Sequence, residues 1–205
     1  MPQTKLIIDA NIYFSVGRDL DPFLGYTFCD EEYALYLCDN FYDEFSRNPG
    51  LVKKFGWVDD LPFRVNRRAP ILSRTQKSQI KEKEAYLEAW QEQQRNFFVN
   101  LGLDPNKELS LDPKEADRHI LATVLVTGFS LVTDDKGLAA LAKATGATAL
   151  SLVEMLRLMF DCAFLDIKQL DGLAQSIDYF DRSDGGAWFR KYLKAFPESA
   201  LHRPS

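Results

Sequence analysis

Short apolar runs separated by helix-like segments constrain the fold of this chain more than any other feature. The runs cover residues 5–8, 34–38, 129–133 and 148–152, and each is too short to form a buried helix of its own. Strands that are apolar throughout are typical of a parallel sheet covered on both faces. Because parallel strands need crossover connections, the alternation of strand and helix predicts an α/β fold with a central, mostly parallel sheet.

Helices are expected where apolar residues recur at helical spacing behind a capping residue. Asp112 is a strong N-cap candidate because a proline follows it and a glutamate lies three residues further on. Asp39 or Asn40 can cap a short helix that carries Phe41 and Phe45. The expected helices cover about 76–100, 112–127, 136–145 and 153–160, with further helical elements after Leu165 that break at 183–186.

Two other segments have a distinctive pattern. Residues 49–74 read as an irregular loop because proline and glycine punctuate them. Trp188, Phe189, Tyr192 and Phe196 form an apolar stripe late in the chain. Such spacing usually means packing against the body of the protein, and a partner-binding or homodimer face is the alternative.

Composition fits one globular domain with insertions. The chain has 205 residues, 46% of them hydrophobic. Its first apolar run is cut short by Asp9, so it has neither the length of a signal-peptide core nor that of a membrane span. Cys29, Cys38 and Cys162 are an odd number without the spacing of a metal site, and we interpret all three as structural. These features predict a soluble cytoplasmic protein with no membrane contact.

Charge is unevenly distributed along the chain. The formal net charge is −5, whereas residues 47–83 hold ten basic against three acidic residues, a net charge of +7. This segment is a candidate for holding a nucleic-acid backbone, and the interleaved Phe55, Trp57 and Phe63 suit stacking on unpaired bases. A solvated charged surface is the alternative. The candidate binding residues are Arg64, Arg67, Arg68, Arg74 and Lys77.

Four acidic residues fall where an α/β sheet builds its ligand site. Asp9 and Asp135 follow apolar runs, and Glu44 lies beside the apolar pair of a short helix. Asp117 belongs to the stripe that its helix should bury, where an ionised carboxylate is costly unless it is paired or bound to metal. If the fold brings the four together, their charges need multivalent cations, for which Mg²⁺ or Mn²⁺ is the natural choice. The acids therefore predict metal-assisted chemistry on a phosphodiester.

Four segments together resemble the PIN domain family, whose members include the VapC-like toxins. They are IIDAN at 7–11, YDEF at 42–45, EADRHILA at 115–122 and FSLVTDD at 129–135. The last two, spaced as a helix and then a strand, are the most specific. The similarity covers the chain to about residue 48 and again over about 111–160.

The resemblance implies a three-layer α/β/α, Rossmann-like domain and a Mg²⁺- or Mn²⁺-dependent endoribonuclease. By position, Asp9, Glu44, Asp117 and Asp135 are similar to the family's metal ligands, and Asn11 and Thr133 to residues that orient them. We expect a nuclease domain over 1–160. The parts outside the resemblance are a basic loop-and-helix insertion at about 49–110 and a helical extension over 161–205, which we expect to pack on that domain. For a toxin, an antitoxin protein would be expected to cover the acidic pocket.

Several alternatives stay open. The chain is longer than compact toxin members, which leaves toxin against housekeeping nuclease undecided. Asp134 stands where the family often has a basic or amide residue, so either Asp134 or Asp135 could be the fourth ligand while the other caps the next helix. Asp43 could likewise serve instead of Glu44. His119 and His202 are too few for a histidine-rich zinc site, and His119 is expected to be an ordinary helix residue.

Two other functions fit part of the sequence. One is a catalytically inert PIN-fold module that binds RNA or protein, against which the presence of all four acids counts. The other is a haloacid dehalogenase-like phosphotransferase, which also begins with an aspartate after its first strand. That family typically has a second aspartate two residues on, where this chain has Asn11.

Overall fold

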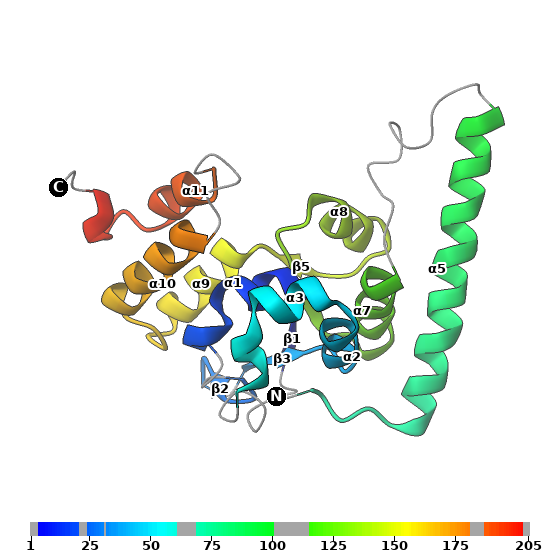
Figure 1. Cartoon of the computed structure of the whole chain (residues 1–205), viewed down its shortest axis with the longest axis horizontal. Coiled ribbons are helices and arrows are strands. Elements are labelled where there is room, and N and C mark those ends of the chain that lie inside the picture. The colour runs from blue at the N-terminus through cyan, green and yellow to red at the C-terminus, as the bar shows by residue number, and fades with distance from the viewer. Residues whose placement is uncertain are drawn as a thin grey trace.

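The computed structural model has a five-stranded sheet at its centre (Figure 1). The sheet has the order β2-β3-β1-β4-β5. In chain order, the strands are β1 (Thr4–Ile8), β2 (Thr27–Phe28), β3 (Tyr33–Leu37), β4 (Ser130–Val132) and β5 (Ala149–Leu150). The structure describes residues 4–20, 24–30, 32–60, 69–100, 115–180 and 187–202 of the 205-residue chain.

Four of the five strands run parallel, with β1 between β3 and β4. Ile8 lies opposite Leu37 of β3 and Val132 of β4. β5 continues the parallel order beside β4, whereas β2 is antiparallel to β3 and is too short to be found from its sequence pattern. The predicted α/β fold with a mostly parallel sheet is confirmed. The carboxyl ends of β1, β3 and β4 consequently meet at one edge of the sheet.

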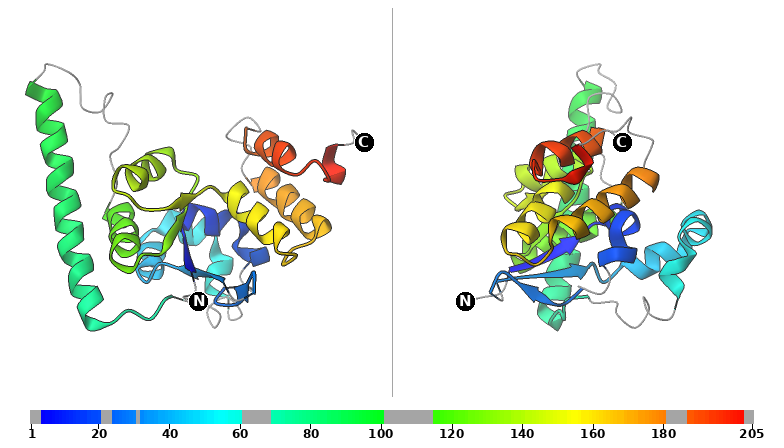
Figure 2. Two further views of the ribbon diagram at one scale, coloured as in Figure 1. Left: turned by 180° about the vertical axis from the view of Figure 1, so that it is seen from behind. Right: turned by 90° about the vertical axis from the view of Figure 1, so that its left-hand side faces the viewer.

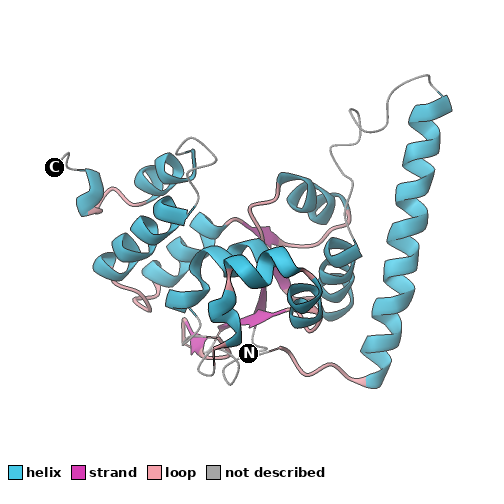
Figure 3. Ribbon diagram, in the orientation of Figure 1, coloured by secondary structure: helices cyan, strands magenta, loops and turns pink. Residues whose placement is uncertain are grey.

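Apolar side chains project from both faces of the sheet because successive strand residues point in opposite directions. Leu6 and Ile8 join one buried cluster and Ile7 joins another. The first cluster takes residues from α1 (Ala10–Leu20), α2 (Phe41–Arg47), α9 (Leu152–Asp161) and α10 (Ile167–Phe180), and the second from α5 (Arg74–Asn100), α7 (Glu115–Thr127) and α8 (Lys136–Ala144). Helices therefore cover both faces, as Figures 2 and 3 show.

The prediction of an irregular loop over 49–74 is wrong at its start, where α3 (Pro49–Lys54) and the 3-10 helix η2 (Gly56–Asp59) form. Asn48 caps α3, because its side-chain oxygen accepts hydrogen bonds from the backbone N–H groups two and three residues on, at 3.1 and 3.2 Å. Proline suits the first turn of a helix, where an N–H group has no intrahelical partner. The Asn-Pro-Gly sequence is thus a helix start and not a break.

α2 begins without the side-chain cap that the sequence predicts. Asn40 makes no capping hydrogen bond, and Asp39 contacts His119 of α7 instead. The helix is held by Phe41 and Phe45, which are both buried in the first cluster. Tertiary packing thus replaces the local cap.

α5 is a 27-residue helix that packs against α7 at one end of the molecule (Figure 1). It begins at reciprocal hydrogen bonds, in which the Ser73 hydroxyl accepts from the Gln76 N–H and the Gln76 side chain accepts from the Ser73 N–H. Ile80 and Leu87 are buried, whereas most of its other residues are exposed. The predicted helix over 76–100 is confirmed apart from two residues at its start. Within the described part of the chain, no helix combines the length and apolar composition needed to cross a bilayer, α5 included.

The aromatic stripe lies on α11 (Ala187–Ala195) and the residue after it, and it packs into the first buried cluster as its spacing predicts. Trp188, Tyr192 and Phe196 are each at most 9% exposed. Asp171 of α10 accepts hydrogen bonds from the hydroxyl groups of Tyr192 (2.7 Å) and Ser199 (2.6 Å), the latter just before the 3-10 helix η4 (Ala200–His202). This buried network fixes α11 against α10.

A disulfide joins Cys29, directly after β2, to Cys162 at the end of α9. The two residues are 133 positions apart in the sequence, with their Cα atoms 5.0 Å apart. Both cysteines are structural, as expected, but their pairing is not predictable, because no spacing rule links cysteines so far apart. Disulfides persist in oxidising compartments and are rare in the cytosol, so this bond weighs against the predicted cytoplasmic location.

Candidate metal-binding site

The predicted acidic residues face one cavity at the edge where the parallel strands end. The cavity has a volume of about 750 Å³. Its walls come from the ends of β1 and β3, the loop after β4 and the helices α1, α2, α7 and α8. The predicted residues along it are Asp9, Asn11, Glu44, Asp117, Asp134 and Asp135. The structure therefore brings together acids that lie up to 126 positions apart in the sequence.

Asp9 is the most buried of these acids, with 7% of its surface exposed. The Thr133 hydroxyl donates a hydrogen bond of 2.9 Å to its Oδ2 atom and itself accepts one of 3.1 Å from the Asp135 N–H. Thr133 is 2% exposed, so it holds the Asp9 carboxylate from inside the fold. The Thr133 hydroxyl therefore fixes the orientation of the Asp9 carboxylate.

The electrostatic environment of Asp9 indicates that its acidic neighbours are close. Burial raises the pKa of Asp9 to about 6, and the negative charges of Asp117 and Asp135 add to the rise. Hydrogen bonds from the Thr133 side chain and the Asn11 backbone oppose it. The Asn11 side chain is exposed at the rim, so its described contact with Asp9 comes from the backbone. Ionised Asp9 is therefore stabilised by hydrogen bonds but lacks a neutralising charge among these contacts.

Asp117 and Glu44 approach the cavity from helices on opposite faces of the sheet. Asp117 lies in the first turn of α7 and is half-buried, three residues before the buried Ile120. Glu44 lies on α2 between the buried Phe41 and Phe45, and it is exposed. Asp117 is thus part of the inner wall, while Glu44 stands at the rim.

Asp134 and Asp135 both contact helix N-termini, which differs from the expectation that one caps and the other is left for a metal. Asp135 is the N-cap of α8, since its Oδ1 atom accepts a hydrogen bond of 2.8 Å from the Leu138 N–H. Asp134 Oδ1 accepts one of 3.1 Å from the Leu152 N–H at the start of α9. Asp135 nevertheless contributes to the charge around Asp9. Capping and ligation can share one carboxylate, because each has two oxygens.

The candidate nucleic-acid residues are only partly described. Arg64, Arg67 and Arg68 lie outside the described residues, as does Phe63. Arg74 and Lys77 are exposed in the first turn of α5.

The aromatic residues of the basic segment have a structural role. Phe55 stacks on Phe14 at 4.5 Å between ring centroids, and Trp57 packs on Tyr13 at 5.5 Å. These two rings hold the α3–η2 segment against α1. Packing therefore accounts for Phe55 and Trp57, and their stacking on unpaired bases stays a prediction.

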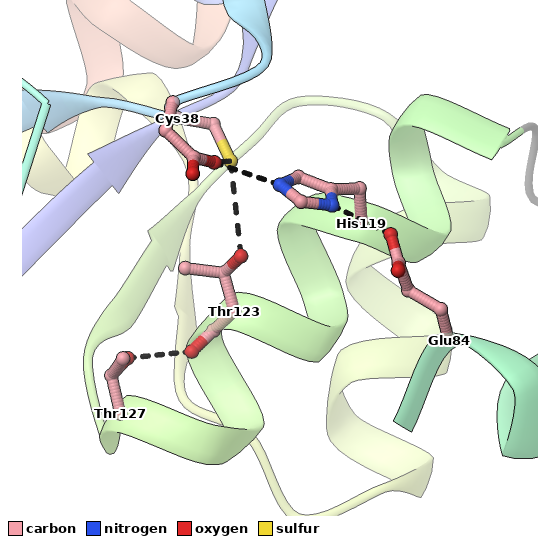
Figure 4. A network of polar contacts seen from close by, with 6 residues as sticks. Cys38, Glu84, His119, Thr123 and Thr127 are labelled. Carbon is pink, nitrogen blue, oxygen red and sulfur yellow. Dashed lines mark hydrogen bonds and ion pairs between the residues drawn. The ribbon is translucent and has the colours of Figure 1, made fainter. Parts of the chain in front are cut away.

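A second group of possible metal ligands adjoins this cavity, and one of its residues, Cys38, also lines the cavity. Cys38 and Asp39 directly follow β3, and His119 comes from α7 (Figure 4). Their ligand atoms all lie within 4.8 Å of one another, so the group could hold a metal ion. Among the described residues, no other group of three or more such side chains meets this distance, and the predicted acids therefore stand further apart around their cavity.

The expectation that His119 is an ordinary helix residue is wrong. Its Nε2 atom lies 2.8 Å from Asp39 Oδ1 and its Nδ1 atom 2.6 Å from Glu84 Oε1 of α5. The contacts with Asp39, with Cys38 and, least, with Glu84 raise the pKa of His119 to about 11, and the contact with His119 lowers the pKa of Asp39. The signal that could have found this group is the position of Cys38 and Asp39 at the end of a parallel strand, the same argument that selects Asp9.

Comparisons with protein-family models, with curated proteins and with solved structures found no match. The function must therefore be argued from the residues and their geometry.

Proposed function

We propose that this chain is a Mg²⁺- or Mn²⁺-dependent endoribonuclease with a PIN-like, three-layer α/β/α fold. Asp9, Glu44, Asp117 and Asp135 would hold the metal, with Asp134 as the alternative to Asp135. The observation that carries the proposal is the burial of Asp9 beside two further carboxylates in one open cavity. Hard divalent cations with oxygen ligands neutralise such a group without other protein charges.

The side chains divide the work as follows. A bound ion would activate a water molecule and neutralise charge at the scissile phosphate. Asp9 is the fixed point of the site, because Thr133 and the Asn11 backbone hold its carboxylate. Asp135 is anchored by its cap on α8, and Asp117 by its place on α7. Glu44 lines the same cavity from α2 and is exposed, so it would contact an ion from the solvent side.

The nuclease proposal predicts that RNA cleavage requires both divalent metal and Asp9. Purified wild-type protein should cut single-stranded RNA in the presence of Mg²⁺ or Mn²⁺, and cleavage should stop when EDTA is added. Asp9→Asn should lower the cleavage rate at least about 100-fold, which is the usual effect of removing one group that stabilises charge in the transition state. Asp60→Asn, an exposed acid that does not line this cavity, is the matched control and should cut like the wild type. Equal cleavage by Asp9→Asn, after identical purification, would show the proposal to be wrong.

Substrate binding should depend on the basic start of α5. Arg74→Glu with Lys77→Glu is expected to weaken binding of a single-stranded RNA about tenfold or more at low salt, and to reduce the salt dependence by about one phosphate contact for each residue. Filter binding or fluorescence anisotropy across a salt series measures both effects. Lys168→Glu on α10 is the control, being an exposed lysine far from this helix in the sequence. An unchanged salt slope in the double variant would exclude these residues from the RNA interface.

A partner protein that covers the acidic cavity would make this chain the toxin of a toxin–antitoxin pair, and a homodimer is a further possible assembly.

The second candidate function is an inert RNA-binding or protein-interaction module. It is favoured by the structural roles of Asp134 and Asp135, whose carboxylates both hold helix N-termini. Calorimetry with Mn²⁺ separates the two, because the nuclease must bind the ion in its cavity and the inert module need not.

A further inference from the structure

The Cys38–Asp39–His119 group has the composition of a transition-metal site. Cys38 Sγ lies 3.8 Å from Asp39 Oδ1, which in turn lies 2.8 Å from His119 Nε2. Tetrahedral coordination by sulfur, oxygen and nitrogen at bond lengths of about 2.0–2.3 Å separates the ligand atoms by about 3.3–3.6 Å. The observed spacings bracket this range. The third pair, Cys38 Sγ and His119 Nε2, lies within 4.8 Å, so small side-chain movements would place all three atoms around one ion.

Glu84 gives His119 a carboxylate partner on the ring nitrogen that would not bind the metal, as metal-bound histidines usually have. Its Oε1 atom lies 2.6 Å from His119 Nδ1, on the side of the ring away from Asp39 (Figure 4). A metal would have to displace the proton that Nε2 now shares with Asp39. A carboxylate at Nδ1 would keep the other proton in place and hold the plane of the ring. Glu84 comes from α5, so the arrangement links the long helix to the end of β3 through α7.

The thiol of Cys38 distinguishes this group from a plain ion-pair network. His119, Asp39 and Glu84 can pair as charges without it, yet Cys38 lies at the end of the strand with 6% exposure and its sulfur directed into the group. It is also the chain's one cysteine outside the Cys29–Cys162 disulfide. The buried Thr123 also contacts this thiol, with its Oγ1 atom 4.0 Å from the sulfur.

We propose that Cys38, Asp39 and His119 form a zinc-binding site, with Glu84 as the residue that positions His119. Thiolate and imidazole ligands select Zn²⁺ over Mg²⁺, which prefers oxygen. Three protein ligands leave a fourth position for water. The chain would thus carry two neighbouring sites with different metal preference, and this second site does not depend on the nuclease proposal.

Cobalt substitution tests the proposal because Co²⁺ occupies zinc sites and its bond to a thiolate gives a near-ultraviolet charge-transfer absorption. The full chain, freed of metal with EDTA and kept in non-reducing buffer, should develop this band with one equivalent of Co²⁺ and lose it on addition of Zn²⁺ but not of excess Mg²⁺. Cys38→Ala should show no band, and His119→Gln should bind at least tenfold more weakly. No band in the wild type, a band in Cys38→Ala, or displacement by Mg²⁺ would each overturn the site.

Glu84→Gln is a second variant that keeps all three ligands and so separates positioning from folding. It is expected to retain the band while its affinity for Co²⁺ falls by about 10- to 100-fold, the usual effect of removing such a partner. Glu82→Gln, an exposed glutamate on the same helix, is the matched control and should bind like the wild type. Equal affinity in Glu84→Gln and Glu82→Gln would overturn the role of Glu84.

Discussion

Asp9→Asn is expected to make the metal-free protein more stable at pH 8, by up to about 3 kcal/mol. Burial and the charges of Asp117 and Asp135 raise the pKa of Asp9 from 3.8 to about 6, so ionised Asp9 destabilises the folded state. Asparagine has the same shape and an oxygen that can accept the 2.9 Å hydrogen bond from Thr133, but it has no charge. Urea unfolding of the two proteins after removal of metal measures the difference.

The gain in stability should depend on pH in a defined direction. Because the pKa of Asp9 is higher in the folded than in the unfolded state, the unfolded chain loses its proton first as the pH rises. The free energy of unfolding of the wild type, relative to Asp9→Asn, should therefore fall between about pH 4 and pH 6 and then remain constant. Asp60→Asn, at an exposed site, should show no such change. A difference between Asp9→Asn and wild type that is equal at pH 4 and pH 8 would contradict the burial of a charged Asp9.

Divalent metal should make the wild type more stable than Asp9→Asn, the reverse of their order without metal. Mg²⁺ at about 100 times its dissociation constant stabilises a protein that binds it by about 2.7 kcal/mol, provided that the unfolded chain does not bind. The wild type should gain this stability, whereas Asp9→Asn should not, because its carboxylate is needed to hold the ion. Thermal unfolding with and without Mg²⁺ measures the gain. Equal stabilisation of both proteins would place the bound ion elsewhere than at Asp9.

The sequence predicts those parts of the fold that local pattern determines. The apolar runs of β1, β3 and β4 and the spacing of α5 and α7 each contain their own signal. β2 does not, because two residues held by pairing to β3 are too few for any periodicity. The start of α3 is unpredictable for another reason. Proline and glycine, here Pro49 and Gly50, are both common in loops, and only the hydrogen bonds to Asn48 show that they begin a helix.

The candidate site is predictable to the extent that strand ends determine it. Asp9 and Asp135 follow strands that lie side by side, so their convergence follows from the sheet order. Cys38 and Asp39 end the neighbouring strand and could have been selected by the same rule. Their relation to His119 and Glu84 could not, because it depends on how α5 packs against α7, and helix packing leaves no periodic signal for a particular pair of polar residues.

Loss of the Cys29–Cys162 disulfide is expected to destabilise the protein by about 2–5 kcal/mol. The bond closes a loop between residues 133 positions apart and so restricts the unfolded chain strongly, while it holds the turn after β2 to the end of α9. Under non-reducing conditions, Cys29→Ser with Cys162→Ser should lower the unfolding temperature by on the order of 10 °C, given about 2–4 °C for each kcal/mol in a chain of this size. Reductant should lower that of the wild type similarly and leave that of the double variant unchanged, which separates the bond from the loss of two sulfur atoms. Equal unfolding temperatures of wild type and double variant without reductant, or two free thiols at these positions by mass spectrometry, would show that the bond does not stabilise the protein.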